Sequence, residues 1–210
     1  MICDYALKAY NSSAVSPVFL TEANMEGAND TNLLTSPANG LVLRRQMYWM
    51  MTSGAAGHVW GNTHVNHSDL TNPTWQSQLN TPATGQVALL TNLLTKYKWW
   101  LLVPDQTKQI VTAGNSNPNP GNENLYNSTY ATTAWITDGS LSLTYVPSAA
   151  TLTIAMNKFA GPTVTAQWFD PTNGVFTAIS GSPFPNSGVQ SFATRGTNSA
   201  GDPDWVLVLQ

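Results

Sequence analysis

A change of pattern near residue 105 constrains the fold of this 210-residue chain more than any other feature. Before it, short apolar runs typical of buried strands alternate with longer segments of helical periodicity. After it, only short strand-like runs and turns follow. Alternating strands and helices indicate parallel βαβ units, whereas closely spaced short strands indicate an antiparallel sandwich. The sequence therefore predicts an α/β part over residues 1–106 and an all-β part over residues 107–210.

The first part contains two strand–helix pairs. Residues 17–22 predict a buried strand that ends in a carboxylate, and residues 57–61 predict a second strand between glycines. The spacing of apolar residues predicts helices over 41–53 and 83–97. Because a closed barrel needs eight such units, we expect these two to be the end of one.

The second part is expected to contain about seven short strands from Ala131 onward. Four examples are Leu141–Val146, Thr151–Met156, Val164–Phe169 and Trp205–Leu209. Residues 112–124 are rich in Asn, Gly and Pro and predict a loop. Trp99 and Trp100 precede this part and are expected to pack between helices or between the two domains.

Composition narrows the classes of function. Only 9% of the residues are charged and the net charge is −3, so no basic patch exists for nucleic acid. No run approaches the roughly 18 apolar residues of a membrane span, and we expect no membrane contact. The N-terminus lacks the features of a signal peptide. Cys3 is the single cysteine and cannot form an internal disulfide or a cysteine zinc site.

Glu22 is the main candidate for a catalytic residue, because it follows an apolar strand at the rim where parallel barrels carry their active sites. A carboxylate there can act as nucleophile or as acid/base on a glycosidic bond. The alternative is a strand-end glutamate that pairs with a loop amide or an arginine, and spacing alone favours it. Glu26 is a candidate substrate ligand, a support for Glu22, or a solvated loop residue.

Three histidines, His58, His64 and His67, fall within ten residues. Their spacing matches no standard metal motif, so we expect no metal, and His58 and His64 are candidates to bind sugar hydroxyls. Trp60 lies at the end of the second predicted strand and can stack on a sugar ring or belong to the core. No nucleotide-binding, serine-hydrolase or metalloprotease motif is present, and no cofactor is expected.

Taken in order, the motifs of the chain resemble a known family. They are Pro17-Val18-Phe19-Leu20-Thr21-Glu22, Arg44-Arg45-Gln46-Met47-Tyr48-Trp49, Gly57-His58-Val59-Trp60-Gly61, Trp99-Trp100-Leu101-Leu102-Val103-Pro104-Asp105 and Gln167-Trp168-Phe169-Asp170-Pro171. The series resembles the apiosidase-like glycoside hydrolases, which have a (β/α)8 TIM barrel followed by a β-sandwich labelled as collagen-binding. The resemblance implies that residues 1–106 are the C-terminal part of the barrel, with strands seven and eight, and that residues 107–210 are the sandwich.

The resemblance also implies a function. Glu22 would end strand seven and act as the nucleophile of a retaining glycosidase that cleaves polysaccharide side chains, while Glu26, Trp60, His64 and His58 hold the sugar. The general acid/base should lie on the fourth strand, which this chain lacks, so the chain alone is expected to be inactive. No metal or cofactor is required. The full-length protein is expected to be secreted or periplasmic.

Two other functions remain open. The chain is alternatively a non-catalytic carbohydrate- or matrix-binding module, or its sandwich only supports the barrel. Two barrel units also leave open parallel strand edges, so we expect self-association through them.

Overall fold

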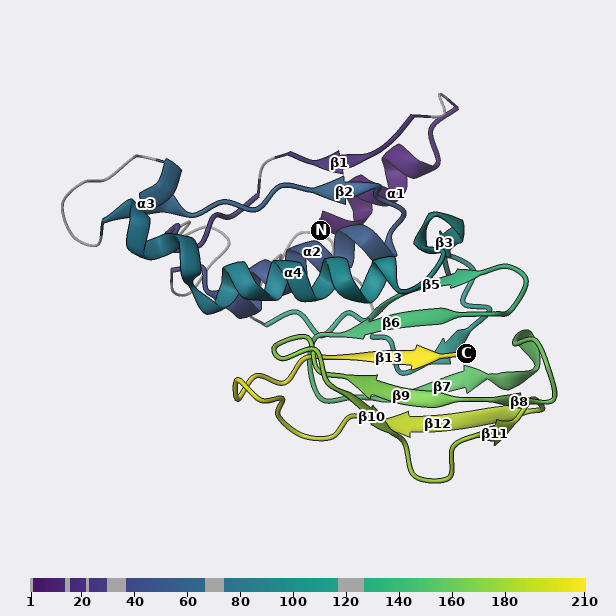
Figure 1. Ribbon diagram of the computed structural model, residues 1–210. Coiled ribbons are helices and arrows are strands. Elements are labelled where there is room, and N and C mark those ends of the chain that lie inside the picture. Colours follow the sequence, from purple (N-terminus) through teal and green to yellow (C-terminus); the bar gives the residue numbers. More distant parts are fainter. Residues whose placement is uncertain (1, 14–15, 22, 30–36, 67–73, 117–126) are drawn as a thin grey trace.

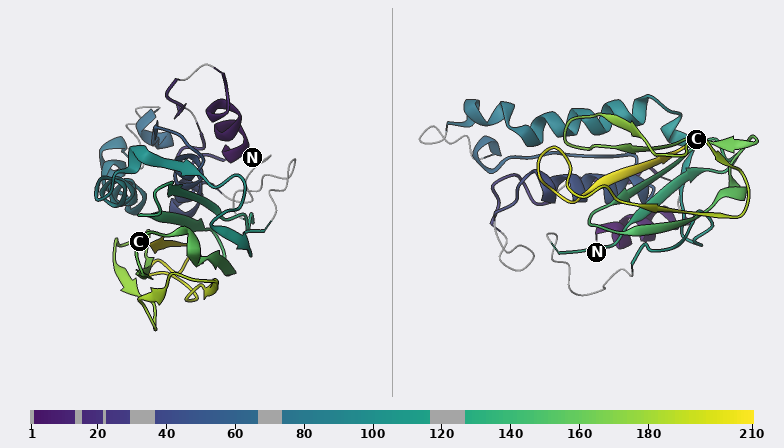
Figure 2. Two further views of the ribbon diagram at one scale, coloured as in Figure 1. Left: turned by 90° about the vertical axis from the view of Figure 1, so that its right-hand side faces the viewer. Right: turned by 90° about the horizontal axis from the view of Figure 1, so that it is seen from below.

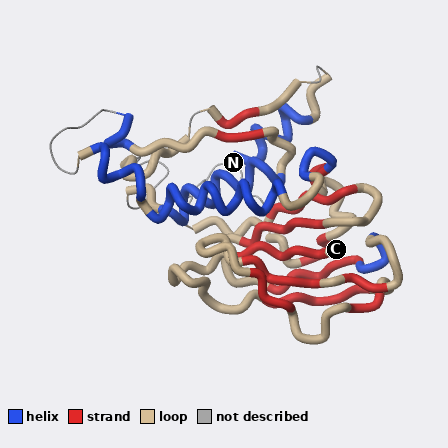
Figure 3. The backbone as a smooth tube through the Cα atoms, viewed as in Figure 1, coloured by secondary structure: helices blue, strands red, loops and turns tan. Residues whose placement is uncertain are grey.

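The structure is a computed structural model of the chain (Figure 1). It describes all residues except 1, 14–15, 22, 30–36, 67–73 and 117–126. The fold is mixed α/β, with several antiparallel sheets and one pair of parallel strands. Helices lie on one side of the main sheet and a smaller sheet lies on the other (Figures 1 and 2). Figure 3 shows this division, with the long blue helices above the red strands of the main sheet.

The N-terminal elements are helices and two short strands. They are α1 (Ile2–Tyr10), β1 (Phe19–Leu20), α2 (Gly40–Thr52), β2 (Gly57–His58), α3 (Thr63–Asn66), the 3-10 helix η1 (Trp75–Asn80), α4 (Pro82–Thr95) and the 3-10 helix η2 (Trp99–Leu101). β1 pairs in parallel with β2, and α2 connects the two strands, so the predicted βαβ unit is confirmed. No helix in the described ranges is long and apolar enough to cross a membrane.

The two helices predicted over 41–53 and 83–97 are confirmed as α2 and α4. Each begins at a side chain that satisfies a free backbone N–H of the first turn. The amide oxygen of Asn39 accepts a hydrogen bond at 3.3 Å at the start of α2, and the hydroxyl oxygen of Thr81 accepts one at 3.3 Å at the start of α4. Helix α1 was not expected.

The first predicted strand is shorter and more exposed than expected. β1 covers only two residues of the predicted range 17–22, and Phe19 is 54% exposed. Within the described part of the chain, β2 is the only strand that pairs with β1, so the other edge of β1 has no strand beside it. The expectation of a buried strand is therefore wrong at Phe19.

The remaining strands form the antiparallel sheets. They are β3 (Leu102–Pro104), β4 (Val111–Ala113), β5 (Thr132–Ile136), β6 (Ser142–Val146), β7 (Thr151–Ala155), β8 (Thr163–Val164), β9 (Ala166–Phe169), β10 (Phe176–Ala178), β11 (Phe184–Pro185), β12 (Val189–Ala193) and β13 (Trp205–Leu209), with the 3-10 helix η3 (Met156–Lys158) after β7. The main sheet has six strands in the order β10-β9-β13-β6-β5-β3. A second sheet has the order β12-β7-β4, and β8 pairs with β11. The four strands named from the sequence are confirmed as β6, β7, β9 and β13.

The main sheet is buried on both faces. Alternate residues of β13 show this, because successive side chains of a strand point to opposite faces. Leu207 and Leu209 belong to the core shared with β4, β7 and β12, whereas Val206 and Val208 belong to the core shared with α1, α2 and α4. Every residue of β5, β6 and β13 is buried for this reason.

Three expectations need correction or stay open around the junction of the two parts. β4 occupies Val111–Ala113, so the predicted loop over 112–124 begins with strand residues. Trp100 is 66% exposed and does not pack as expected. β3 pairs with β5 and is part of the main sheet, and the predicted domain boundary after residue 106 stays a prediction.

A buried ion pair joins α2 to the segment before β13. Nε and Nη2 of Arg44 donate hydrogen bonds to the two carboxylate oxygens of Asp204, both at 2.8 Å. Nη2 also donates to Asp202 at 2.6 Å, and Nη1 donates to Oε1 of Gln86 on α4 at 2.7 Å. The hydroxyl of Tyr145 on β6 donates to Asp204 at 3.0 Å. The side chains of Arg44 and Asp204 are 1% and 0% exposed, so water does not reach the two charges. The hydrogen bonds of this network take the place of those that water would make.

Candidate functional site

The carboxyl ends of β1 and β2 lie side by side, and the segments that follow them remain joined. The backbone N–H of Glu26 donates to the carbonyl of Gly61 at 2.8 Å, and the N–H of Thr63 donates to the carbonyl of Glu26 at 2.9 Å. A Cβ at Gly61 would lie 2.7 Å from Cγ of Met25, so a larger residue there would displace the Met25 side chain. The two loops therefore form one continuous rim beyond the strands.

A hollow of about 360 Å³ opens at this rim. Its polar lining includes three asparagines, Asn24, Asn62 and Asn66. Trp60 and Met25 contribute apolar surface. Amide groups beside an aromatic ring suit a ligand that has many hydroxyl groups and an apolar face, which is the chemistry of a sugar.

The carboxylate of Glu26 connects the segments that form the rim. Its Oε2 accepts hydrogen bonds from Nδ2 of Asn62 at 3.2 Å and from the hydroxyl of Thr81 at 2.8 Å. Oδ1 of Asn62 in turn accepts from the backbone N–H of His64 at 2.9 Å. The carboxylate thus connects the loop after β1, the loop after β2 and the start of α4. These contacts hold the rim together, and the predicted role of Glu26 as a substrate ligand stays a prediction.

Gln46 on α2 holds the loop after β1, and sequence reasoning did not identify it. Its Oε1 accepts from the backbone N–H of Asn24 at 2.9 Å, and its Nε2 donates to the carbonyl of Asn24 at 3.1 Å. The side chain is buried. A glutamine in a helix is most often exposed to water, so the sequence gives no sign of this role. The role becomes visible only because α2 is buried on all sides.

The remaining predicted site residues are placed as follows. Trp60 lines the hollow, whereas His58 and His64 do not belong to its lining. Nε1 of Trp60 and Nε2 of His58 are buried without a hydrogen-bond partner among the described residues. Glu22 and His67 lie outside the described residues. Within the described ranges, no three His, Cys, Asp or Glu side chains are grouped to hold a metal ion.

Burial lowers the pKa of His58 below its usual value of about 6.5. The unfolded chain therefore binds a proton more readily than the folded one, and stability that is present above pH 6.5 is lost as the pH falls below it. We expect the melting temperature to fall between about pH 7 and pH 5, and the His58→Gln variant to show a smaller fall. Melting curves across this range test the expectation, and equal falls in the two proteins would contradict it.

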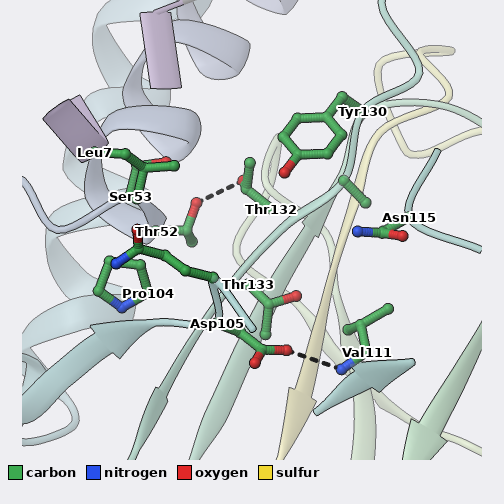
Figure 4. Close-up of a pocket in the computed structure, with 12 residues that line it drawn as sticks. Leu7, Thr52, Ser53, Pro104, Asp105, Val111, Asn115, Tyr130, Thr132 and Thr133 are labelled. Carbon is green, nitrogen blue, oxygen red and sulfur yellow. Dashed lines mark hydrogen bonds between the residues drawn. The ribbon is translucent and has the colours of Figure 1, made fainter. Parts of the chain in front are cut away.

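A smaller hollow of about 30 Å³ lies between α1, α2 and the all-β part (Figure 4). The hydroxyls of Thr52 and Thr132 are 2.6 Å apart at its wall. The carboxylate of Asp105 accepts hydrogen bonds from the backbone N–H groups of Ile110 and Val111, both at 3.0 Å. Because its polar groups serve the fold and its volume suits only water, this hollow is no candidate for a substrate site.

Two family models match the chain. One, described as "Apiosidase-like, catalytic domain", matches residues 1–101. The other, described as "Putative collagen-binding domain of a collagenase", matches residues 103–210. Comparison with curated proteins gave no match.

Solved structures are similar to almost the whole chain. A glycoside hydrolase family 5 protein from Bacteroides vulgatus ATCC 8482 has a TM-score of 0.78 and 22% identity, over 99% of this chain and 44% of its own. A second structure, described as a glycoside hydrolase, has a TM-score of 0.77 and 20% identity, over 99% of this chain and 45% of its own. This chain spans less than half the length of either protein, and the likeness at these identities concerns the fold. The resemblance inferred from the motifs is confirmed by the family matches: residues 1–101 match the apiosidase-like catalytic domain, and the chain belongs to the family of the C-terminal domain, whose model covers residues 103–210.

Proposed function

We propose that the chain is the C-terminal part of a retaining glycoside hydrolase. In this proposal β1 and β2 are the seventh and eighth strands of a TIM barrel, and the two facing sheets are a β-sandwich attached to it. The observation that carries the proposal is the hollow beyond the paired strands, lined by Trp60 and three asparagines. Barrel enzymes bind their substrates at this end of the strands.

Glu22 is the proposed nucleophile, because it follows Leu20 of β1 by two residues in the sequence. Its carboxylate attacks the anomeric carbon as the bond to the leaving oxygen breaks, and a second carboxylic acid protonates that oxygen. Water then hydrolyses the glycosyl ester and regenerates Glu22, with the second residue acting as base. The acid/base residue belongs to a strand outside this chain. The proposed substrates are the side chains of polysaccharides.

The rim residues position the sugar. Trp60 stacks on an apolar face of the ring, and His64 on α3 remains a candidate to bind a hydroxyl. Glu26 and His58 act through the rim, since the contacts of Glu26 are with Asn62 and Thr81 and His58 does not belong to the lining of the hollow.

The Trp60→Ala variant tests the sugar site. We expect it to weaken binding of a neutral oligosaccharide by about tenfold or more, because an aromatic anchor commonly contributes about 2 kcal/mol. Trp100→Ala is the matched control, since Trp100 is exposed elsewhere and should leave affinity unchanged. Isothermal titration calorimetry measures both, and equal losses in the two variants would refute the assignment.

The second candidate, a non-catalytic glycan- or matrix-binding module, is favoured by the description of the family that matches residues 103–210. It predicts that loss of Glu22 leaves the function of the full-length protein intact. We also propose a secreted or periplasmic location for the full-length protein, supported by a polysaccharide substrate, and self-association through the free edge of β1.

A further inference from the structure

A third hollow, of about 270 Å³, lies at one end of the main sheet. It is bounded by the turn between β9 and β10 and by the segment that leads into β13. This segment, yellow in Figure 1, lies at the same end of the molecule as α3 and the rim site. The volume is just below the roughly 300 Å³ at which pockets for drug-sized ligands begin, and it has room for about one sugar unit.

Arg195 is the charged group that this hollow offers to a ligand. Its guanidinium lies 5.7 Å from the ring centroid of Trp205, and the residue is exposed. Trp205 is itself fixed, because its Nε1 donates to the carbonyl of Gly196 at 3.0 Å. Arg195 forms no ion pair with a carboxylate of the described residues. The aromatic ring therefore orients a guanidinium whose N–H groups remain available.

The other charged group of the hollow is Asp170, whose carboxylate oxygens already accept hydrogen bonds from the protein itself. Burial alone would raise its pKa, but hydrogen bonds from Thr172 and Ser199 outweigh burial and lower it. Oδ1 accepts from the backbone N–H and the hydroxyl of Thr172, and Oδ2 accepts from the N–H and the hydroxyl of Ser199. With four donors around it, this carboxylate organises the loops and leaves Arg195 to set the charge preference of the hollow.

We propose that this hollow binds the carboxylate of a uronic acid unit in an acidic polysaccharide. The planar guanidinium of Arg195 presents two parallel N–H groups, which match the two oxygens of a carboxylate. The hydroxyls of Thr177 and Thr197 line the same hollow and suit the hydroxyls of the sugar ring. The choice of a glycan rests on the proposed function, since the site lies at the same end of the molecule as the rim hollow.

Charge separates the two sites. The chain has eight Lys and Arg residues, and none of them lines the rim hollow. The rim hollow is therefore suited to a neutral sugar, whereas Arg195 is suited to a separate, acidic unit of the polymer.

The test is calorimetric titration of the chain with trigalacturonate, with a neutral xylo-oligosaccharide for comparison. We expect Arg195→Ala to weaken trigalacturonate binding by about tenfold or more, and Arg195→Lys, which keeps the charge but not the fork, to weaken it less. Lys158→Ala is the matched control, because Lys158 is an exposed cation outside the hollow and should change affinity by less than about twofold. Added salt should weaken binding to the wild type more than to Arg195→Ala.

Failure to bind trigalacturonate, unchanged affinity in Arg195→Ala, or an equal loss in Lys158→Ala would overturn the proposal. Binding of a collagen peptide through Arg195 in place of the acidic sugar would also overturn it. The Glu22→Gln variant should bind trigalacturonate as the wild type does. Loss of hydrolysis in that variant concerns the proposed function alone, and loss of acidic-sugar binding in Arg195→Ala concerns this site alone.

Discussion

Replacing Arg44 with methionine should lower the free energy of unfolding by about 3–5 kcal/mol, because it leaves a buried carboxylate without its cation. Asp204 is fully buried and accepts two hydrogen bonds from Arg44. The remaining donors, Tyr145 and Asn198, are neutral and cannot balance its charge. For a chain of this length the loss corresponds to a fall of about 10 °C in the melting temperature.

Urea titration and thermal melting measure this effect. Arg195→Met makes the same change at an exposed arginine whose ring contact is with Trp205, and it should cost less than about 1 kcal/mol. Adding Asp204→Asn to the Arg44→Met protein should recover part of the lost stability, because the uncompensated charge is then removed. Equal stability of Arg44→Met and the wild type would show that the ion pair does not join α2 to the segment before β13.

Replacing Glu22 with glutamine in a protein that includes the other barrel strands should lower the rate of hydrolysis by about 10³-fold or more. The expected cause is loss of the attacking carboxylate, since the amide is a far weaker nucleophile. In Glu22→Ala, added azide should restore turnover by taking the place of the carboxylate and leaving a glycosyl azide as product.

Glu26→Gln is the matched control for this experiment. Its carboxylate contacts Asn62 and Thr81 at the rim, so we expect a smaller loss of rate and no rescue by azide. Hydrolysis that survives in Glu22→Gln would favour the non-catalytic module instead.

Signals that act over a few residues could be predicted from the sequence. Helices α2 and α4 were identified because the spacing of their apolar residues is a local pattern. Strand β13 was identified because a short run such as Trp205–Leu209 is apolar throughout, as a strand buried on both faces must be. The parallel pairing of β1 with β2 followed from the strand–helix–strand order.

Contacts between distant segments could not be predicted. Arg44 and Asp204 are separated by 160 positions, and an arginine in a helix gives no sign that another part of the chain will bury it. The same limit applies to the rim, where Gln46 and Thr81 lie 22 and 55 positions after the residues of the loop that they contact. Phe19 and Trp100 are apolar, yet both are exposed, because exposure depends on which elements lie beside them.

The central claim is that Glu22 is the nucleophile of a retaining glycosidase, and covalent labelling of the 210-residue chain tests it most directly. The reagents are dinitrophenyl glycosides fluorinated at the carbon next to the anomeric centre, in a panel of pentoses and hexoses. Dinitrophenolate leaves without a proton, so the missing acid/base residue is not needed for this step. We predict a mass increase of one fluoroglycosyl unit, located by peptide mass spectrometry on Glu22. A label on Glu26, or release of sugar with inverted anomeric configuration and no label, would contradict the account.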